Sequence, residues 1–326
     1  MPLPWTDLHH RLHRVLKSRS LLTPGHRLLL GVSGGQDSLC LWRLCLDLQP
    51  QWGWELGILH CDHRWRSDSQ ANAHHVQTLA AQWGTPYHGI VADRPLPTEA
   101  AARQWRYQGL AHCAQTHHYQ AVLTAHTASD RAETLLQNLI RGSGADGLGA
   151  LPWQRDLAPG LPLVRPLLFA TRQETGDFCA AQGLPLWVDS TNDDPRYGRN
   201  RLRLEVLPLL RQHFNPQVDR HLAHTADLMA ADVAYLEAQA HHLRQQIQDD
   251  RRLDRTLLQP APLALQRRVI RQFLGQWLPC APTFAHIEKT IALISAPQGS
   301  QTDPFPGGAI VQVRKPWLVL TDPHLP

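Results

Sequence analysis

A six-residue loop near the start of the chain constrains the fold more than any other feature. Its residues are Ser33, Gly34, Gly35, Gln36, Asp37 and Ser38. The apolar run 28–32 precedes the loop, and the helix-compatible stretch 39–48 follows it. This pattern predicts a buried strand that turns through the loop into a helix N-terminus. Glycines let the loop N–H groups point outward, and the helix dipole adds partial positive charge, so we expect an anion cradle that fits a polyphosphate.

The loop differs from a Walker phosphate loop, because that motif needs a lysine beside its last serine or threonine. The only lysines of the chain are Lys17, Lys289 and Lys315. Asp37 stands near that position instead. A carboxylate beside phosphates repels them unless a divalent cation lies between, so Asp37 predicts Mg²⁺ bound together with the nucleotide. An ordinary glycine-rich turn, in which Asp37 or Ser38 only caps the helix, remains the alternative.

Strands and helices alternate through the first two thirds of the chain. Helices are predicted at 5–17, 39–48, 69–83, 99–118, 128–141 and 172–182, and strands at 27–32, 54–59, 87–91, 121–124 and 186–188. This spacing predicts an α/β fold with a doubly wound, mainly parallel sheet and ligands at the carboxyl ends of the strands. The glycine- and proline-rich segment 142–166 is expected to be a long loop over the sheet edge.

Three polar clusters follow predicted strands and should converge at one edge of the sheet. They are residues 33–38, 60–66 and 126–133. In the second, His60, Asp62 and His63 could ligate a metal, although a polar strand end is the more common meaning of such a set. In the third, Asp130 and Glu133 are three residues apart on one helical face, where two carboxylates can hold a cation.

Composition limits the class of protein. The 326 residues suggest about two domains, and we place them at 1–212 and at 213–326, the second a mostly helical domain with a hairpin at 309–314 and 317–321. No apolar run approaches the roughly 20 residues of a membrane span, and residues 1–19 do not resemble a signal peptide. The six cysteines form no C-x-x-C pair, which disfavours disulfide scaffolds, zinc and iron–sulfur clusters. We therefore expect a cytoplasmic protein without membrane contact, whose net charge of +4 allows an acidic partner.

Seven motifs, in order, carry a resemblance to a known family. They are S-G-G-Q-D-S at 33–38, D-H-R-W-R at 62–66, E-A-A-A-R-Q-W-R-Y at 99–107, A-H-T-A-S-D-R-A-E-T at 125–134, R-G-S-G-A-D-G-L at 141–148, R-P-L-L at 165–168 and D-S-T-N-D-D-P-R-Y-G-R-N-R-L-R at 189–203. The first resembles the pyrophosphate loop of ATP pyrophosphatases. The series as a whole looks like tRNA(Ile)-lysidine synthetase, with matching order and spacing over most of residues 20–212.

This resemblance implies a reaction. ATP would adenylate the C2 carbonyl of the wobble cytidine in the CAU anticodon of tRNA(Ile), and free L-lysine would then attack through its ε-amine, with release of AMP and pyrophosphate. The partners implied are ATP with Mg²⁺, lysine and tRNA. The second domain would bind tRNA, with Arg267, Arg268 and Arg271 as phosphate contacts.

With the resemblance as a guide, the site residues can be assigned. The assignments are Asp37, Asp130, Glu133 and Arg201 for catalysis; Ser33, Gly34, Gly35, Gln36, Asp37, Ser38, Asp62 and His63 for ATP; Asp37 for Mg²⁺; Asp130 and Glu133 for lysine; and Arg103, Arg106, Arg199 and Arg203 for tRNA. Simpler interpretations stay open. Glu99 and Arg103 could form a surface ion pair, the arginines at 196–203 could lie on a solvated helix face, and Asp130 and Glu133 could only brace their helix against Arg103 or Arg131.

The third cluster departs from the family pattern. The family usually has His-His-x-Asp-Asp-Gln-x-Glu-Thr, whereas this chain has Thr127, Ser129 and Arg131 at three of those positions. Adjacent helical residues point about 100° apart, while residues three apart nearly align. We therefore expect Asp130 and Glu133 to act together and Ser129 to be tolerated.

Two other functions remain to be weighed. A tRNA thiolase on the same fold is a close rival, but such enzymes usually need the paired cysteines that this chain lacks. A nucleotide-binding module without catalysis is suggested only by the altered third cluster. The sequence does not fix the oligomeric state, and a homodimer is compatible with it.

Overall fold

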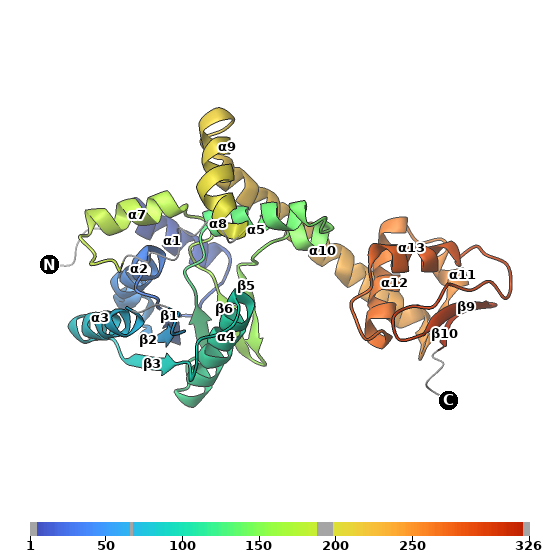
Figure 1. Cartoon of the computed structure of the whole chain (residues 1–326), viewed down its shortest axis with the longest axis horizontal. Helices are drawn as coiled ribbons and strands as arrows, with labels where there is room; N and C mark the ends of the chain where they lie inside the picture. Colours follow the sequence, from blue (N-terminus) through green and yellow to red (C-terminus); the bar gives the residue numbers. More distant parts are fainter. Residues whose placement is uncertain (1–4, 66–67, 188–197, 322–326) are drawn as a thin grey trace. The chain divides into compact units, whose positions relative to one another are not determined.

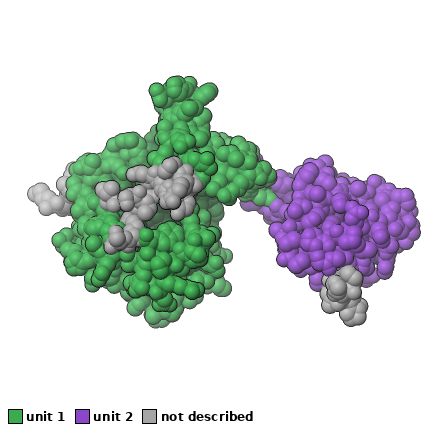
Figure 2. Space-filling view, viewed as in Figure 1, with its two compact units in different colours: residues 1–230 green, residues 231–326 purple. Residues whose placement is uncertain are grey.

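The computed structural model describes residues 5–65, 68–187 and 198–321 and divides into two compact units, residues 1–230 and 231–326 (Figures 1 and 2). The division falls within the long helix α10 (Val218–Ile247), and the boundary predicted after residue 212 precedes that helix. No helix in the described part of the chain is both long and apolar enough to span a bilayer.

A six-stranded sheet forms the centre of the first unit, with the order β3-β2-β1-β4-β6-β5. Its strands are β1 (Arg27–Gly31), β2 (Glu55–Asp62), β3 (Tyr87–Val91), β4 (Ala121–Leu123), β5 (Gln154–Ala158) and β6 (Leu161–Val164). Every pairing is parallel except that of β5 with β6. The predicted mainly parallel sheet is confirmed. The chain adds β2 and β3 on one side of β1 and then β4 on the other side, and folds of this kind bind ligands at the strand ends where the strand order changes direction in this way.

Successive side chains of β1 point to opposite faces of the sheet, and both faces are covered by helices. Leu28 and Leu30 point into one core, and Leu29 points into another, each fully buried. The first core is shared with helices α1 (Asp7–Ser18), α2 (Gln36–Trp52), α3 (Ser69–Gln82) and α7 (Arg172–Ala181). The second is covered by α4 (Glu99–Thr116), on the opposite face of the sheet (Figure 1). Continuous apolar strands of this kind are typical of a sheet buried on both sides.

Two predictions about local structure are wrong. The segment 142–166 is not one long loop, because it contains α6 (Ala145–Leu148) and the β5–β6 hairpin. Leu161 and Leu163 alternate into the core, and Gly160 takes a φ of +72° in the turn, so the prolines and glycines there mark a hairpin. The prediction of a strand at 186–188 is also wrong for residues 186 and 187, the two that the structure describes. Trp187 is irregular, and its N–H donates to the Gly34 carbonyl at 3.0 Å.

Short helical segments connect α7 to α10. The motif residues 189–197 lie outside the described residues, and the chain continues through α8 (Gly198–Arg201), a π-helical turn η2 (Leu202–Val206) and α9 (Leu207–His213). The turn η2 contacts α5 (Ala128–Ile140). π-helical turns are rare and occur often at functional sites, and this one carries Arg203.

The second unit has its own core and sheet. Helices α11 (Arg255–Leu258), α12 (Leu263–Trp277) and α13 (Phe284–Ala292) pack with an antiparallel sheet of order β7-β8-β10-β9. The hairpin of β9 (Ile310–Arg314) and β10 (Trp317–Thr321) was expected, whereas β7 (Gln248–Asp249) and β8 (Arg252–Asp254) are too short to be seen in the sequence. Phe273, Val311 and Leu318 are fully buried, so this unit buries a separate core.

Candidate active site

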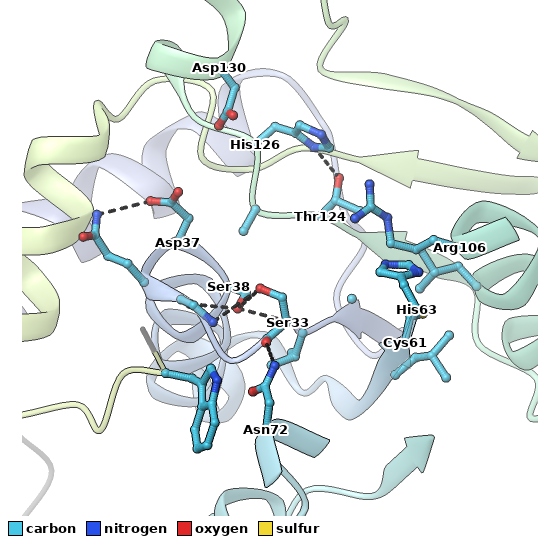
Figure 3. A pocket seen from close by; sticks show the side chains of 18 of the residues that line it. Ser33, Asp37, Ser38, Cys61, His63, Asn72, Arg106, Thr124, His126 and Asp130 are labelled. Atoms are coloured by element: carbon cyan, nitrogen blue, oxygen red, sulfur yellow. Dashed lines mark hydrogen bonds between the residues drawn. The ribbon is translucent and has the colours of Figure 1, made fainter. Parts of the chain in front are cut away.

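A cavity of about 560 Å³ lies at the carboxyl ends of the central strands (Figure 3). All three predicted polar clusters contribute to its lining, through the 33–38 loop, His63, and the pair His126 and Asp130. Figure 3 shows Asp37 and Asp130 on one side of this cavity and His63 and Arg106 on the opposite side. The expectation that residues far apart in sequence converge at this edge of the sheet is confirmed.

Gly34 is the one residue of the loop whose backbone conformation requires glycine. Gly34 has a φ of +87°, and a Cβ built there would lie 2.5 Å from Asn72 Oδ1. Gly35 has an ordinary φ of −78° and is the N-cap of α2. A Cβ at Gly35 would meet only the Ser33 hydroxyl, at 3.5 Å. Gly34 therefore makes the turn, whereas Gly35 has an ordinary backbone angle and leaves space beside the cavity.

Hydrogen bonds within the loop, and one from helix α3, hold the loop in place. Ser38 Oγ donates to the Gly35 carbonyl at 2.8 Å and accepts from the Ser33 N–H at 3.2 Å. Asn72 Nδ2 donates to the Ser33 carbonyl at 3.0 Å. Among the described atoms, Asn72 Oδ1 is buried without a hydrogen-bond partner, so it is an acceptor available to a donor of a bound ligand. Asn72 could not be predicted as a site residue, because nothing in the local sequence pattern of α3 shows that it reaches the loop.

Asp37 is held by α7, which the sequence analysis did not connect with the loop. Thr175 Oγ1 donates to Asp37 Oδ1 at 2.5 Å, and Arg172 Nη1 lies 3.7 Å from Asp37 Oδ2. Burial and the nearby charge of Asp130 raise the pKa of Asp37, and Arg172 opposes them only in part. A cation next to Asp37 would relieve this repulsion. The donor set, the Asp37 carboxylate with the negative charge of Asp130 nearby, therefore fits a hard divalent ion such as Mg²⁺.

Asp130 is oriented by the first turn of α5. Its Oδ2 accepts from the N–H and the hydroxyl of Thr127, each at 2.8 Å, in a capping box. Its Oδ1 lies 2.9 Å from Arg199 Nη2 and 3.6 Å from Arg203 Nη2. Burial alone would raise the pKa of Asp130, but the positive charge of Arg199 lowers it to about 2. Asp130 is thus a fixed anion at the cavity wall.

Glu133 is buried and forms ion pairs with the same two arginines, Arg199 and Arg203. Its carboxylate accepts from Arg199 Nε at 2.8 Å and from Arg203 Nε at 2.6 Å, and its side chain is 1% exposed. Glu133 is not among the described residues that line the cavity, whereas Asp130 and Arg203 are. Glu133 and Asp130 therefore share Arg199 and Arg203 as ion-pair partners, although only Asp130 lines the cavity.

Two of the three residues that depart from the family pattern, Ser129 and Arg131, bond to α10 and do not line the cavity. Ser129 Oγ donates to Asp219 Oδ2 at 2.8 Å and accepts from the Arg172 N–H at 3.1 Å. Arg131 Nη1 lies 2.6 Å from Asp227 Oδ1. The bracing partners that the sequence analysis considered for Asp130 and Glu133 were Arg103 and Arg131. The partners found are Arg199 and Arg203.

Two neutral histidines line the cavity. Burial is the main cause that lowers the pKa of His126 to about 3, and His126 Nδ1 lies 3.0 Å from Thr124 Oγ1. Burial and the charge of Arg106 lower the pKa of His63 to about 4. His63 Nδ1 is buried without a partner among the described atoms. At neutral pH both rings are uncharged hydrogen-bonding groups next to Arg106.

The remaining predicted residues lie around this centre. Asp62 accepts from the Arg64 N–H at 2.8 Å and from Ser69 Oγ at 3.2 Å, so it fixes the turn that carries His63. Arg106 lines the cavity, whereas Arg103 and Arg201 are exposed. Gln36 Nε2 donates to the Arg172 carbonyl at 2.6 Å and so ties the loop to α7.

A parallel sheet with a glycine-turned loop, an adjacent carboxylate and a cavity at the strand ends defines a PP-loop nucleotide-binding protein. The family described as "PP-loop domain" matches residues 5–210, and that described as "TilS substrate binding domain" matches residues 253–315. The "tRNA(Ile)-lysidine synthase" of Nostoc sp. is 56% identical over 97% of both chains. That of a Synechococcus strain (PCC 6301) is 51% identical, also over 97% of both chains. The chain belongs to the tRNA(Ile)-lysidine synthase family.

A solved structure supports the fold independently. The chain aligns with the "U34-tRNA thiolase NcsA from Methanococcus maripaludis with its [4Fe-4S] cluster" at a TM-score of 0.58. Their sequences are 14% identical, and the match covers 69% of this chain and 78% of that one. At this identity the likeness concerns the fold alone.

Proposed function

We propose that this chain ligates lysine to C2 of the wobble cytidine in the CAU anticodon of tRNA(Ile), with conversion of ATP to AMP and pyrophosphate. The observation that carries this proposal is the near-complete coverage of relatives named tRNA(Ile)-lysidine synthase at up to 56% identity, together with an intact pyrophosphate loop. The product would read AUA instead of AUG, and charging would switch from methionine to isoleucine. We place this activity in the cytoplasm, where bacterial tRNA is modified.

The 33–38 loop would bind the phosphates of ATP. Its backbone N–H groups stand at the N-terminus of α2, where the helix dipole favours an anion. Asp37 would hold Mg²⁺, which would neutralise phosphate charge. Arg172 and Arg203 both line the cavity and would offset the negative charge that builds on the α-phosphate during adenylation.

Asp130 would attract the ε-ammonium of lysine. That group has a pKa near 10.4, so it arrives charged and must lose a proton before it can attack C2. Asp130 lines the cavity and stays ionised, because Arg199 lowers its pKa to about 2. Glu133 would act as a positioning residue that holds Arg199 and Arg203, since it is not among the described residues that line the cavity and its carboxylate pairs with both arginines. To bind both carboxylates directly, an ammonium would have to displace those arginines.

The two rival functions predict different products. A thiolase would transfer sulfur to the tRNA, and the chain has no C-x-x-C pair to carry it. A non-catalytic module would bind ATP without releasing pyrophosphate.

An assay that follows lysine and sulfur separates these three functions. With ATP, Mg²⁺, labelled lysine and a tRNA(Ile) transcript, the purified protein should place one lysine on the wobble cytidine and release one AMP and one pyrophosphate per modified tRNA. The methionine tRNA, which shares the CAU anticodon, is the matched control and should stay unmodified. Pyrophosphate release without lysine incorporation, or incorporation of sulfur, would contradict the proposal.

The second unit would supply affinity for tRNA, as its match to a substrate-binding domain suggests. Arg267 pairs with Glu288 at 2.7 Å, and Arg268 and Arg271 both pair with Glu237, at 3.1 and 2.5 Å. A phosphate must compete with these glutamates. Replacing all three arginines by glutamine should reduce the slope of log K against log salt by about three, because each lost phosphate contact removes roughly 0.9. Filter binding of tRNA over a range of salt concentrations would measure this slope.

The matched control removes an arginine from the first unit. Arg27 pairs with Glu55 at 2.9 Å and begins β1 at the end opposite the cavity. Arg27→Gln should leave the salt slope unchanged. An unchanged slope in the triple variant would show that these arginines stay with their glutamates and do not contact tRNA.

A further inference from the structure

Two histidines and a cysteine meet on the face of the sheet that α4 covers. His88 lies on β3, Cys113 lies in the last turn of α4, and His117 is the residue that caps this helix. One ligand atom of each lies within 4.8 Å of the others. None of the three lines the cavity. The nucleotide site therefore does not account for this cluster.

The helix presents Cys113 and His117 on one face. The His117 N–H donates to the Cys113 carbonyl at 3.0 Å, so the helical i, i+4 spacing continues through the cap. The edge strand β3 supplies His88, whose ring centroid lies 4.1 Å from that of His117. The cluster thus joins the end of α4 to the edge of the sheet through three side chains of types that commonly ligate metals.

His88 also has an outer partner that fixes its ring. The Tyr119 hydroxyl lies 3.0 Å from His88 Nε2. A Cβ at Gly57 would lie 1.9 Å from that hydroxyl, so glycine at this position of β2 makes room for it. A ligating imidazole is commonly oriented through a hydrogen bond to its other ring nitrogen. This support distinguishes the cluster from three side chains that meet by chance on a surface.

We propose that His88, Cys113 and His117 bind one Zn²⁺ ion. One thiolate and two imidazoles form a donor set that suits Zn²⁺, and three protein ligands leave a fourth tetrahedral position for water. A tetrahedral ion needs ligand atoms roughly 3.3–3.7 Å apart, so ligand atoms that lie within 4.8 Å of one another would have to approach by no more than about 1.5 Å. Cys113 is 7% exposed while His117 is exposed, so an ion can enter from the solvent side.

The ion would fasten the edge strand β3 to the end of α4. Earlier turns of the same helix carry Arg106 and Tyr107 to the cavity. The absence of paired cysteines led the sequence analysis to disfavour zinc, but this site combines Cys-x-x-x-His on a helix with a histidine 25 residues earlier. Such a combination becomes visible only when the strand and the helix are placed together.

Cobalt substitution of the full chain tests this site. Tag-free protein, treated with chelator and reductant and then desalted, should bind one equivalent of Co²⁺ with a thiolate-to-cobalt charge-transfer band and tetrahedral d–d bands. Zn²⁺ should abolish both and raise the melting temperature. Cys113→Ala should remove the charge-transfer band, and His117→Ala, at an exposed position that leaves the fold unaffected, should weaken binding at least about tenfold.

Matched variants guard against adventitious binding by other residues. Cys280→Ser removes the exposed thiol of the second unit, and His112→Ala removes an exposed histidine of α4; both should leave the spectrum and the affinity unchanged. The proposal is overturned if no charge-transfer band forms, if Cys113→Ala retains it, or if Cys280→Ser loses it.

Discussion

Replacement of Asp37 by alanine is expected to reduce ATP-dependent pyrophosphate release by ~10²- to 10³-fold, the usual cost of losing one preorganised electrostatic contact in an active site. Asp37 is the carboxylate next to the 33–38 loop, and burial together with Asp130 raises its pKa. Without Asp37, the divalent cation that accompanies ATP loses its protein ligand. Pyrophosphate release in the presence of tRNA, measured at saturating ATP, gives the effect directly.

The fold should survive this change. A carboxyl whose pKa is raised in the folded state destabilises that state once the pH exceeds the unfolded value, so at pH 7 the removal of the Asp37 charge costs no charge-dependent stability. Thr175 Oγ1 can still donate to the Arg172 carbonyl at 3.0 Å. Asp47→Asn is the matched control, because Asp47 lies on the same helix and pairs with Arg43 away from the cavity. Normal pyrophosphate release by folded Asp37→Ala would remove Asp37 from the proposed metal site.

The strand–loop–helix around residues 33–38 could be predicted from sequence because its determinants are local. Apolar residues before the loop form β1, Gly34 permits the turn, and α2 begins at Gln36. The parallel sheet followed from the spacing of such units, and the convergence of Asp37, His63 and Asp130 followed from the parallel sheet. Each of these steps needs only the nearby sequence and a general rule of chain topology.

The partners of the site carboxylates could not be predicted in the same way. Arg199 reaches Glu133 across 66 residues, and Thr175 reaches Asp37 across 138. An arginine-rich run is compatible with a solvated face, a tRNA contact or an ion pair, and only the packing of η2 on α5 shows that Arg199 and Arg203 pair with Glu133. The β5–β6 hairpin was missed because proline and glycine are typical of both loops and hairpin turns.

The altered third cluster is explained by side-chain direction. Ser129 points to Asp219, so a carboxylate at position 129 would meet another carboxylate there. Arg131 is buried against Asp227, and Thr127 forms the capping box that orients Asp130. Ser129 and Arg131 thus affect the packing of α5, and Thr127 affects its N-terminal cap. The positions of Asp130 and Glu133 do not depend on a carboxylate at position 129. This arrangement supports catalysis over the alternative of an inactive nucleotide-binding module.

Asp130→Asn is expected to raise the KM for lysine by about tenfold to a hundredfold, equivalent to the ~1.5–3 kcal/mol of a hydrogen bond to a charged group. Asparagine keeps an oxygen that can accept from Thr127, but it removes the negative charge that would attract the ammonium. Adenylation should change little, because the phosphate loop and Asp37 are intact. The measurement compares lysidine formation over a range of lysine concentrations with pyrophosphate release at fixed ATP.

Two variants on the same helix separate direct binding of lysine from positioning. Ser129→Ala removes a side chain that faces Asp219 instead of the cavity, so the KM for lysine should stay unchanged. Glu133→Gln frees Arg199 and Arg203 from their principal partner, so both adenylation and lysine transfer should decline, since Arg203 lines the cavity. A selective rise in the KM for lysine with Glu133→Gln, and none with Asp130→Asn, would reverse the two roles. Unaltered lysine dependence in both variants would place the lysine site elsewhere.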